Sequence, residues 1–141
     1  MKYLGIDYGS KKIGVAISDD GGAFAFPLSI IKSDKESINN IVDILLSKNI
    51  SSVVIGESVN DKGEKNIVDS KIKNFANELS QLYISKVNSE LKVYFEKEWY
   101  SSVEARRYDD KYEVDDRAAA IILQRYLDRV QVRANIDTCL E

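Results

Sequence analysis

Three acidic residues that lie far apart in the sequence could together bind a divalent metal ion. Asp7 comes at the end of the first predicted strand, Glu98 follows a later strand, and Asp115 precedes a predicted helix. Hard cations such as Mg²⁺ prefer several carboxylate oxygens, and two-metal cleavage of a phosphodiester bond uses such a cluster. Taken singly, each residue also fits an ordinary role in a turn, at a strand end or at a helix cap. The three together indicate a metal site, provided that the fold gathers them.

The composition narrows the chemistry available to this chain of 141 residues. It contains no histidine and a single cysteine, Cys139, which excludes Ser-His-Asp and Cys-His catalysis, histidine zinc sites and an internal disulfide. The net charge of −3 argues against a protein that coats nucleic acid without specificity. An acidic enzyme site neutralised by metal remains possible. No apolar run is long enough to span a membrane and no signal-peptide pattern is present, so we expect a cytoplasmic protein.

The first part of the chain is predicted to form consecutive strands. Alternation of apolar residues places Gly5 and Asp7 on one face of the first strand, opposite to Leu4 and Ile6. Pro27, the only proline, indicates an edge or irregular position in the third strand. The three predicted strands cover residues 2–7, 12–18 and 24–31.

Helices and strands then alternate, which is typical of an α/β domain with a mixed sheet. Ser33 or Asp34 is the expected cap of the first helix, and Ser101 begins a capping box that predicts a short helix. We expect one domain over residues 1–141 with a loose tail from about residue 130. The other predicted elements are helices over 35–48, 66–88 and 115–129 and strands over 52–56 and 91–97.

The last predicted helix has small residues on one face. Positions 115, 118, 119 and 122 share this face, and Ala118 and Ala119 would allow it to approach the sheet closely. That approach would carry Asp115 toward the strand ends. On the fifth strand, Glu96 and Glu98 share a face by alternation, so either could line the site.

Four segments, taken in order, resemble the YqgF (RuvX) family. Gly5 to Asp19 (Gly-Ile-Asp-Tyr-Gly-Ser-Lys-Lys-Ile-Gly-Val-Ala-Ile-Ser-Asp) resembles the opening motif of that family. Residues 53–56 resemble its fourth strand, and Gly63 the glycine of the following loop. Residues 98–105 resemble its Asp-Glu-Arg-x-Thr/Ser-Thr/Ser segment, and 114–124 its Asp-x-x-Ala-Ala-x-x-Ile-Leu-Gln helix. The resemblance covers about residues 2–128.

This family comprises proteins described as Holliday junction resolvases and as pre-16S ribosomal RNA nucleases. The resemblance implies an RNase H-like fold with strands one to three antiparallel, and Asp7, Glu98 and Asp115 as the acidic triad. It also implies dependence on Mg²⁺ or Mn²⁺ and a role in maturing the 5′ end of small-subunit ribosomal RNA. The expected substrate-binding residues are two lysines after the first turn, a hydroxyl pair at a helix start and a basic residue of the same segment: Lys11, Lys12, Ser101, Ser102 and Arg106.

Two departures from the family pattern bear on activity. Lys97-Glu98-Trp99 stands where the family has Asp-Glu-Arg, so one acid and the arginine are lost. Glu57-Ser58 replaces the proline expected after the fourth strand. Glu57 is either a replacement acid or a surface residue, and we favour the surface interpretation.

These features lead to three functional hypotheses. The first is a metal-dependent endonuclease, a phosphodiester hydrolase acting on structured RNA, supported by the acidic triad and by basic residues. The second is a Holliday junction resolvase, which would act on four-way DNA as a symmetric dimer. The third is a catalytically weakened protein that binds RNA or ribosome-assembly factors. The expected partner is structured nucleic acid, ribosomal RNA precursor in preference to a DNA junction, with no membrane and a monomer or weak homodimer. The basic residues that support the first hypothesis are Lys62, Lys65, Arg106 and Arg107.

Overall fold

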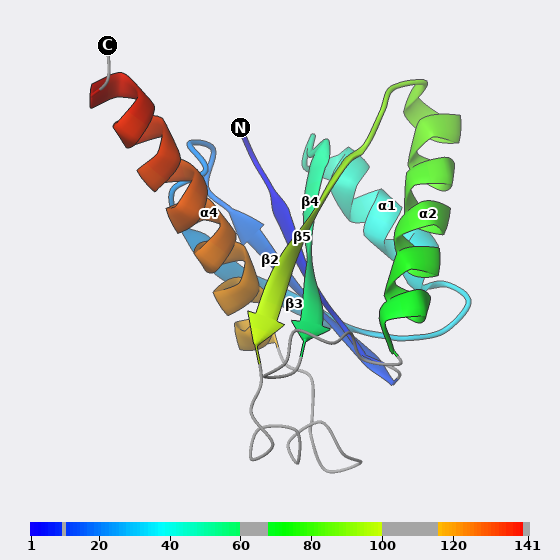
Figure 1. Cartoon of the computed structure of the whole chain (residues 1–141). Coiled ribbons are helices and arrows are strands. Elements are labelled where there is room, and N and C mark those ends of the chain that lie inside the picture. Colours follow the sequence, from blue (N-terminus) through cyan, green and yellow to red (C-terminus); the bar gives the residue numbers. More distant parts are fainter. Residues whose placement is uncertain (10, 60–67, 100–115, 140–141) are drawn as a thin grey trace.

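The chain forms a five-stranded mixed sheet in the computed structural model (Figure 1). The strand order is β3-β2-β1-β4-β5. β1 and β2 pair antiparallel, as do β2 and β3, whereas β4 is parallel to β1 and β5 is parallel to β4. This is the RNase H-like topology, and the predicted fold class is confirmed. The strands are β1 (Leu4–Tyr8), β2 (Lys12–Ser18), β3 (Ala25–Lys32), β4 (Ser52–Val59) and β5 (Lys92–Trp99).

The structure describes residues 1–9, 11–59, 68–99 and 116–139; at 58–59, 68–69, 98–99, 116 and 132–139 it describes the backbone alone. The predicted loop over 60–65 and the short helix from Ser101 lie outside these residues. None of the helices in the described ranges is long and apolar enough to cross a membrane.

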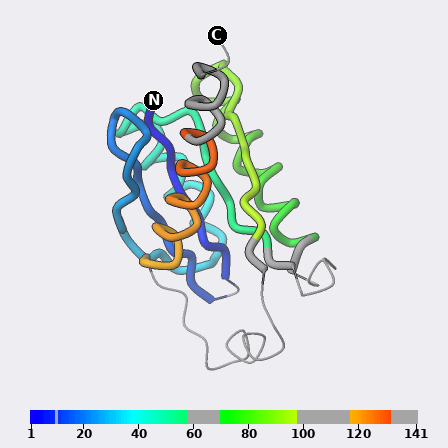
Figure 2. The backbone as a smooth tube through the Cα atoms, turned by 60° about the vertical axis from the view of Figure 1, so that its left-hand side comes forward, coloured from blue at the N-terminus to red at the C-terminus, as the bar shows by residue number. Residues whose placement is uncertain are grey.

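Helices cover both faces of the sheet. α1 (Ser37–Ser47) and α2 (Val68–Val87) lie on one face, and α4 (Asp116–Cys139) lies on the other, as Figures 1 and 2 show from two directions. Two apolar clusters fill the spaces between these layers. Leu4, Ile6 and Val53 belong to the larger cluster, under α1 and α2, and Ala16 and Val54 belong to the cluster under α4. Adjacent residues of a strand thus enter different cores, as alternation predicts.

The closest approach of α4 to the sheet is at Gly5. A Cβ atom placed on Gly5 would lie 2.8 Å from Leu123 Cβ and 3.0 Å from the Ala119 carbonyl oxygen. Ala119 and Leu123 are both completely buried. A glycine in β1 and an alanine in α4 therefore allow the backbones to approach each other, which is the contact that the small helical face predicted.

Several predicted boundaries differ from the structure, most of them by one or two residues. β4 continues three residues beyond the predicted end, to Val59. α4 continues ten residues beyond Arg129, the predicted end of the last helix. The backbone of 130–139 is helical, and this segment contains no glycine or proline that would end a helix; that this tail is loose stays a prediction. The N-cap of α1 is Glu36, without a side-chain cap.

Asp34, one of the two expected caps, lies two residues before the N-cap of α1 and forms hydrogen bonds there. Its Oδ1 accepts a hydrogen bond from the Glu36 amide at 2.9 Å, and its carbonyl oxygen accepts one from the Ser37 hydroxyl at 2.8 Å. Asp34 therefore organises the turn that leads into α1, while the helix itself starts two residues later than predicted.

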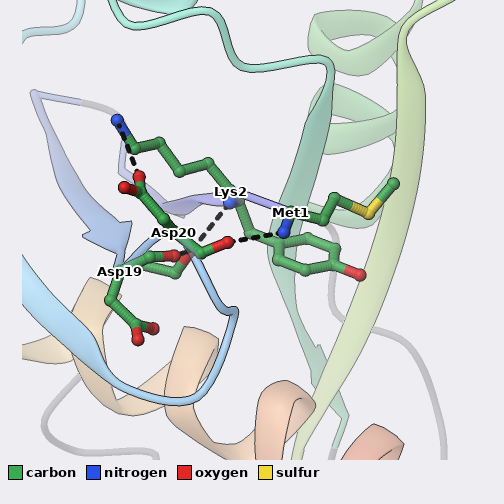
Figure 3. Close-up of polar contacts among 6 residues, drawn as sticks. Met1, Lys2, Asp19 and Asp20 are labelled. Atoms are coloured by element: carbon green, nitrogen blue, oxygen red, sulfur yellow. Dashed lines mark hydrogen bonds and ion pairs between the residues drawn. The ribbon is translucent and has the colours of Figure 1, made fainter.

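The N-terminus is bound to the β2–β3 hairpin (Figure 3). The terminal ammonium group of Met1 donates to the Asp20 carbonyl oxygen at 2.5 Å, and Lys2 Nζ lies 3.2 Å from Asp20 Oδ1. The Asp19 carboxylate accepts hydrogen bonds from the Ala23 and Phe24 amides, and these bonds lower its pKa. Polar contacts thus hold the end of the sheet that lies opposite to the C-terminus of β1.

Gly5→Ala should destabilise the protein by about 1–3 kcal/mol, because the new methyl group overlaps Leu123 and the helix backbone. Urea unfolding would measure the loss. Gly21→Ala is the matched control, since a Cβ there meets only Asp19 Oδ2 at 3.5 Å. Equal stability of the two variants would contradict the close contact.

Candidate active site

Asp7 lies near the C-terminal end of β1, on the face of the sheet that α4 covers. It pairs with Gly14 of β2 and is half-buried. Gly5, two residues earlier on the same face, is the residue in contact with α4. Asp7 therefore emerges from the sheet beyond the α4 contact, where the parallel strands end.

The first turn of α4 lies at about the same height as Asp7. α4 runs antiparallel to β1, because Gly5 lies against Ala119 and Leu123 whereas Tyr3 packs against Tyr126, with ring centroids 5.7 Å apart. From Gly5 to Asp7 the strand rises roughly 7 Å, which corresponds to about four or five residues of helix. The helix position level with Asp7 is thus at the helix start, next to residue 115.

The other two triad positions are only partly described. The backbone of Glu98 lies in β5 opposite Ser58, and Asp115 lies outside the described residues, immediately before the first residue of α4. Within the described ranges, no group of three or more acidic or cysteine side chains could hold a metal ion. Whether the triad meets stays a prediction. Other expected site residues also lie outside: Ser101, Ser102, Arg106, Arg107, Lys62 and Lys65.

Glu96, a buried residue of β5, forms an ion pair with the exposed Arg129 of α4. The Glu96 side chain is only 8% exposed, and Arg129 Nη1 and Nη2 lie 3.3 and 2.5 Å from its two carboxylate oxygens. Arg129 also lies over the ring of Tyr126, 5.7 Å from its centroid. The sequence left open whether Glu96 or Glu98 lines the site; Glu96 is bound to Arg129. Sequence reasoning missed Arg129, because its partner lies 33 residues away.

Glu57 is buried, so the surface interpretation is wrong. It is 4% exposed, because β4 extends to Val59 and encloses a position that was expected to follow the strand. Val53 and Ile55 pack with the α1 and α2 cluster, and alternation places Glu57 on their face. That is the face opposite to Asp7, so Glu57 does not supply a replacement acid beside it.

The lysines after the first turn are exposed. Lys11 and Lys12 both lie at the solvent surface, at the end of the sheet where β1 ends. Lys12 pairs across the sheet with Lys32, the last residue of β3. Lys32 was not singled out from the sequence, because its position beside Lys12 depends on the strand register.

A cavity of about 270 Å³ lies on the other face, between the end of β1 and helices α1 and α2. Tyr8 lines it and packs against Phe75 of α2, with the rings tilted and their centroids 5.0 Å apart. Asp7 and Tyr8 are neighbours in β1 and point to opposite faces, so this cavity does not contain the candidate acidic site. The remaining lining residues are mostly polar: Ser33, Asp34, Ser37, Ile38, Lys71, Asn74 and Glu78.

The comparison with protein families agrees with the strand order and with the motifs. Residues 1–129 match the family model RuvX, described as Holliday junction resolvase. The chain belongs to the RuvX family. This confirms the resemblance that the four sequence segments indicated, and it makes the chain a member of a nuclease family.

RuvX relatives share about a third of their residues with this chain. This chain is 32% identical over 136 residues to a "Putative pre-16S rRNA nuclease" of Sulfurihydrogenibium sp. (strain YO3AOP1). The match covers 92% of this chain and 91% of the relative. The chain is 33% identical to the protein of the same description from Lawsonia intracellularis, covering 94% and 100%. These relatives span the domain almost from end to end.

Solved structures show weaker similarity. The fowlpox virus Holliday junction resolvase has a TM-score of 0.49 and 18% identity, covering 92% of this chain and 99% of that one. Thermus thermophilus RuvC in complex with its Holliday junction substrate has a TM-score of 0.42 and 12% identity, covering 76% and 68%. At these values the similarity says nothing about activity.

Arg129→Ala should destabilise this RuvX family member by about 1–3 kcal/mol, because it leaves the Glu96 carboxylate buried without its counter-charge. The loss is smaller than for a fully buried pair, since the Arg129 side chain is 56% exposed. Adding Glu96→Gln should recover part of it. Urea unfolding of the single and double variants measures the coupling, and Arg125→Ala, an exposed position on the same helix, is the control. Additive effects would contradict the pair.

Three tyrosines pack next to this ion pair. Tyr94 and Tyr126 have ring centroids 5.1 Å apart, and Tyr3 lies edge-on to Tyr126. Burial, followed by the nearby Tyr3 and Tyr94 hydroxyls, raises the pKa of Tyr126 to about 12, and Arg129 partly opposes this shift. The neutral phenol is thus the form that the folded protein favours.

Stability should therefore fall as the pH rises from about 10 to about 12. The pKa of Tyr126 is higher in the folded state than the ordinary value of 10.0, so its contribution is complete below pH 10 and is lost as the pH approaches 12. Thermal unfolding across this range measures the loss, and Tyr126→Phe should reduce it. A variant that loses stability with the same pH dependence as wild type would show that Tyr126 is not responsible.

Proposed function

We propose that this chain is a metal-dependent endonuclease that cleaves structured RNA, with the 5′ end of the pre-16S ribosomal RNA as its substrate. Asp7, Glu98 and Asp115 hold the metal in this proposal. The observation that carries it is the place of Asp7: it lies at the end of β1 on the α4 face, level with the start of the helix that follows Asp115.

The donor set suits Mg²⁺ or Mn²⁺, because all three expected ligands are carboxylates. When bound, the metal would activate a water molecule and stabilise the leaving oxygen. Position 98 follows Glu96 by two residues, so alternation along β5 would give it the same face of the sheet as Glu96, the face that α4 covers. Lys11 and Lys12 at the same end of the sheet would neutralise substrate phosphates together with Arg106, and the Ser101 and Ser102 hydroxyls would donate hydrogen bonds to them.

RNA is the first choice of substrate because relatives that match nearly the whole chain are described as "Putative pre-16S rRNA nuclease". Four-way DNA is the second candidate, since the family model is described as a Holliday junction resolvase. Cleavage of the RNA and not of the four-way DNA, or the reverse, would decide between them. A resolvase would cut the DNA as a dimer. Lys97 and Trp99, which replace family residues beside Glu98, would reduce the rate or leave a protein that only binds. We place the activity in the cytoplasm, in a monomer or weak homodimer.

Asp7→Asn should lower the rate of RNA cleavage at least about 100-fold, because even changes outside the ligand shell of a metal cost 10- to 100-fold. Cleavage of a 5′-extended RNA hairpin and of a four-way DNA junction would be followed with Mg²⁺, with Mn²⁺ and with EDTA. Asp43→Asn, the same change at an exposed position of α1, is the control and should cut like wild type. If Asp7→Asn cuts as fast as Asp43→Asn, the site is assigned wrongly.

A further inference from the structure

We propose that Lys12 and Lys32 form a phosphate-binding track on which the nucleic-acid strand crosses the β3 edge of the sheet toward Asp7. The identity of the ligand as nucleic acid rests on the proposed function. The track itself rests on strand register, exposure and charge.

The two lysines face each other across neighbouring strands. Lys12 and Lys32 are direct partners in the antiparallel pairing of β2 and β3. The Ser33 amide donates a hydrogen bond to the Lys11 carbonyl oxygen at 2.9 Å, which continues the pairing one step further and holds both strand ends. Directly opposed residues have Cβ atoms about 4.5–5.5 Å apart, so the two ammonium groups can contact the same or adjacent phosphates.

The pair lies on the same face as Asp7. Ile13 and Val15 of β2 pack with the α1 and α2 cluster, whereas Ala16 packs with the α4 cluster. Alternation then places Lys12 on the α4 face. Because Asp7 pairs with Gly14, Lys12 is its diagonal neighbour, at a distance of about 7–8 Å.

Neither lysine forms an ion pair with a described residue. Like charges directly opposed in a sheet are destabilising, and Lys12 and Lys32 are both exposed. In the part of the chain that the structure describes, the ion pairs are Lys2–Asp20 and Arg129–Glu96, and neither includes this pair. The sequences of β2 and β3 contain no acidic residue.

A nucleic-acid backbone fits this arrangement better than a single small anion. The cations extend from the edge strand toward the acidic site, and Arg117 in the first turn of α4 is also exposed at this end. A strand with regularly spaced phosphates would place one on the lysine pair while the next part of the chain reaches Asp7. The pair therefore positions substrate and takes no part in bond cleavage.

The test measures binding without cleavage. A fluorescein-labelled RNA hairpin with a single-stranded 5′ extension is titrated with protein in EDTA at increasing salt, and a labelled four-way DNA junction is titrated in parallel. Lys12→Gln/Lys32→Gln should weaken binding by about tenfold per lysine at 0.1 M salt and reduce the slope of log affinity against log salt by about 2. Lys32→Gln alone should show half of this change in slope.

The control is Lys86→Gln/Lys92→Gln, which removes the same charge at exposed positions at the end of α2 and the start of β5, the opposite end of the sheet. It should bind like wild type. Lys12→Gln/Lys32→Gln should unfold at the same urea concentration as wild type or higher, because it removes a repulsion, so weaker binding cannot be attributed to misfolding.

Several outcomes would overturn the track. Equal affinities and salt slopes for the two double variants would do so while leaving the proposed nuclease function intact. If polyglutamate displaces the RNA as effectively as unlabelled RNA does, the ligand of the lysine pair is an acidic protein and not a nucleic acid. If wild type binds neither RNA nor DNA junction, the track and the proposed function both fail.

Discussion

The contact between Gly5 and α4 determines how the last helix lies against the sheet. A helix normally packs against a sheet through side chains of some length, but here the strand residue has none and the helix presents Ala119. The short distance leaves little freedom in how α4 lies along β1. Because α4 runs antiparallel to β1, its N-terminal end comes to the height of Asp7. The height of the α4 start relative to Asp7 thus follows from a requirement for small residues several ångströms away.

Contacts on both sides of this region hold the sheet against α4. The Tyr3, Tyr94 and Tyr126 rings fill the space between β1, β5 and α4, and Arg129 joins α4 to Glu96 near the end of β5. At the other edge, Gln124 Nε2 donates to the Ala23 carbonyl oxygen and Gln124 Oε1 accepts from the Ala25 amide. α4 is therefore connected to both outer parts of the sheet, and the parallel strands that carry Asp7 and Glu98 have a defined relation to its first turn.

The distribution of charge complements this arrangement. The chain has a net charge of −3, so its surface as a whole repels a polyanion. Cations at the Asp7 end of the sheet offset it locally: Lys11, Lys12 and Lys32 are all exposed there. An acidic protein with exposed lysines at one end of the sheet attracts a polyanion there, because binding elsewhere on the surface is unfavourable.

The sequence alone determined the properties that depend on neighbouring residues. The alternation in β1 and the small face of α4 each lie within a few residues, so they predicted which face of the first strand carries Asp7 and the close helix contact. The antiparallel arrangement of the first three strands was implied by the family resemblance, and the strand order β3-β2-β1-β4-β5 came from the structure. The opening and closing motifs also identified the family. Tertiary structure alone decided three further points, because each depends on residues brought together from distant segments: the burial of Glu57 by an extended β4, the capture of Glu96 by Arg129, and the pairing of Lys12 with Lys32. Strand length and register set these contacts, and neither can be read from local periodicity.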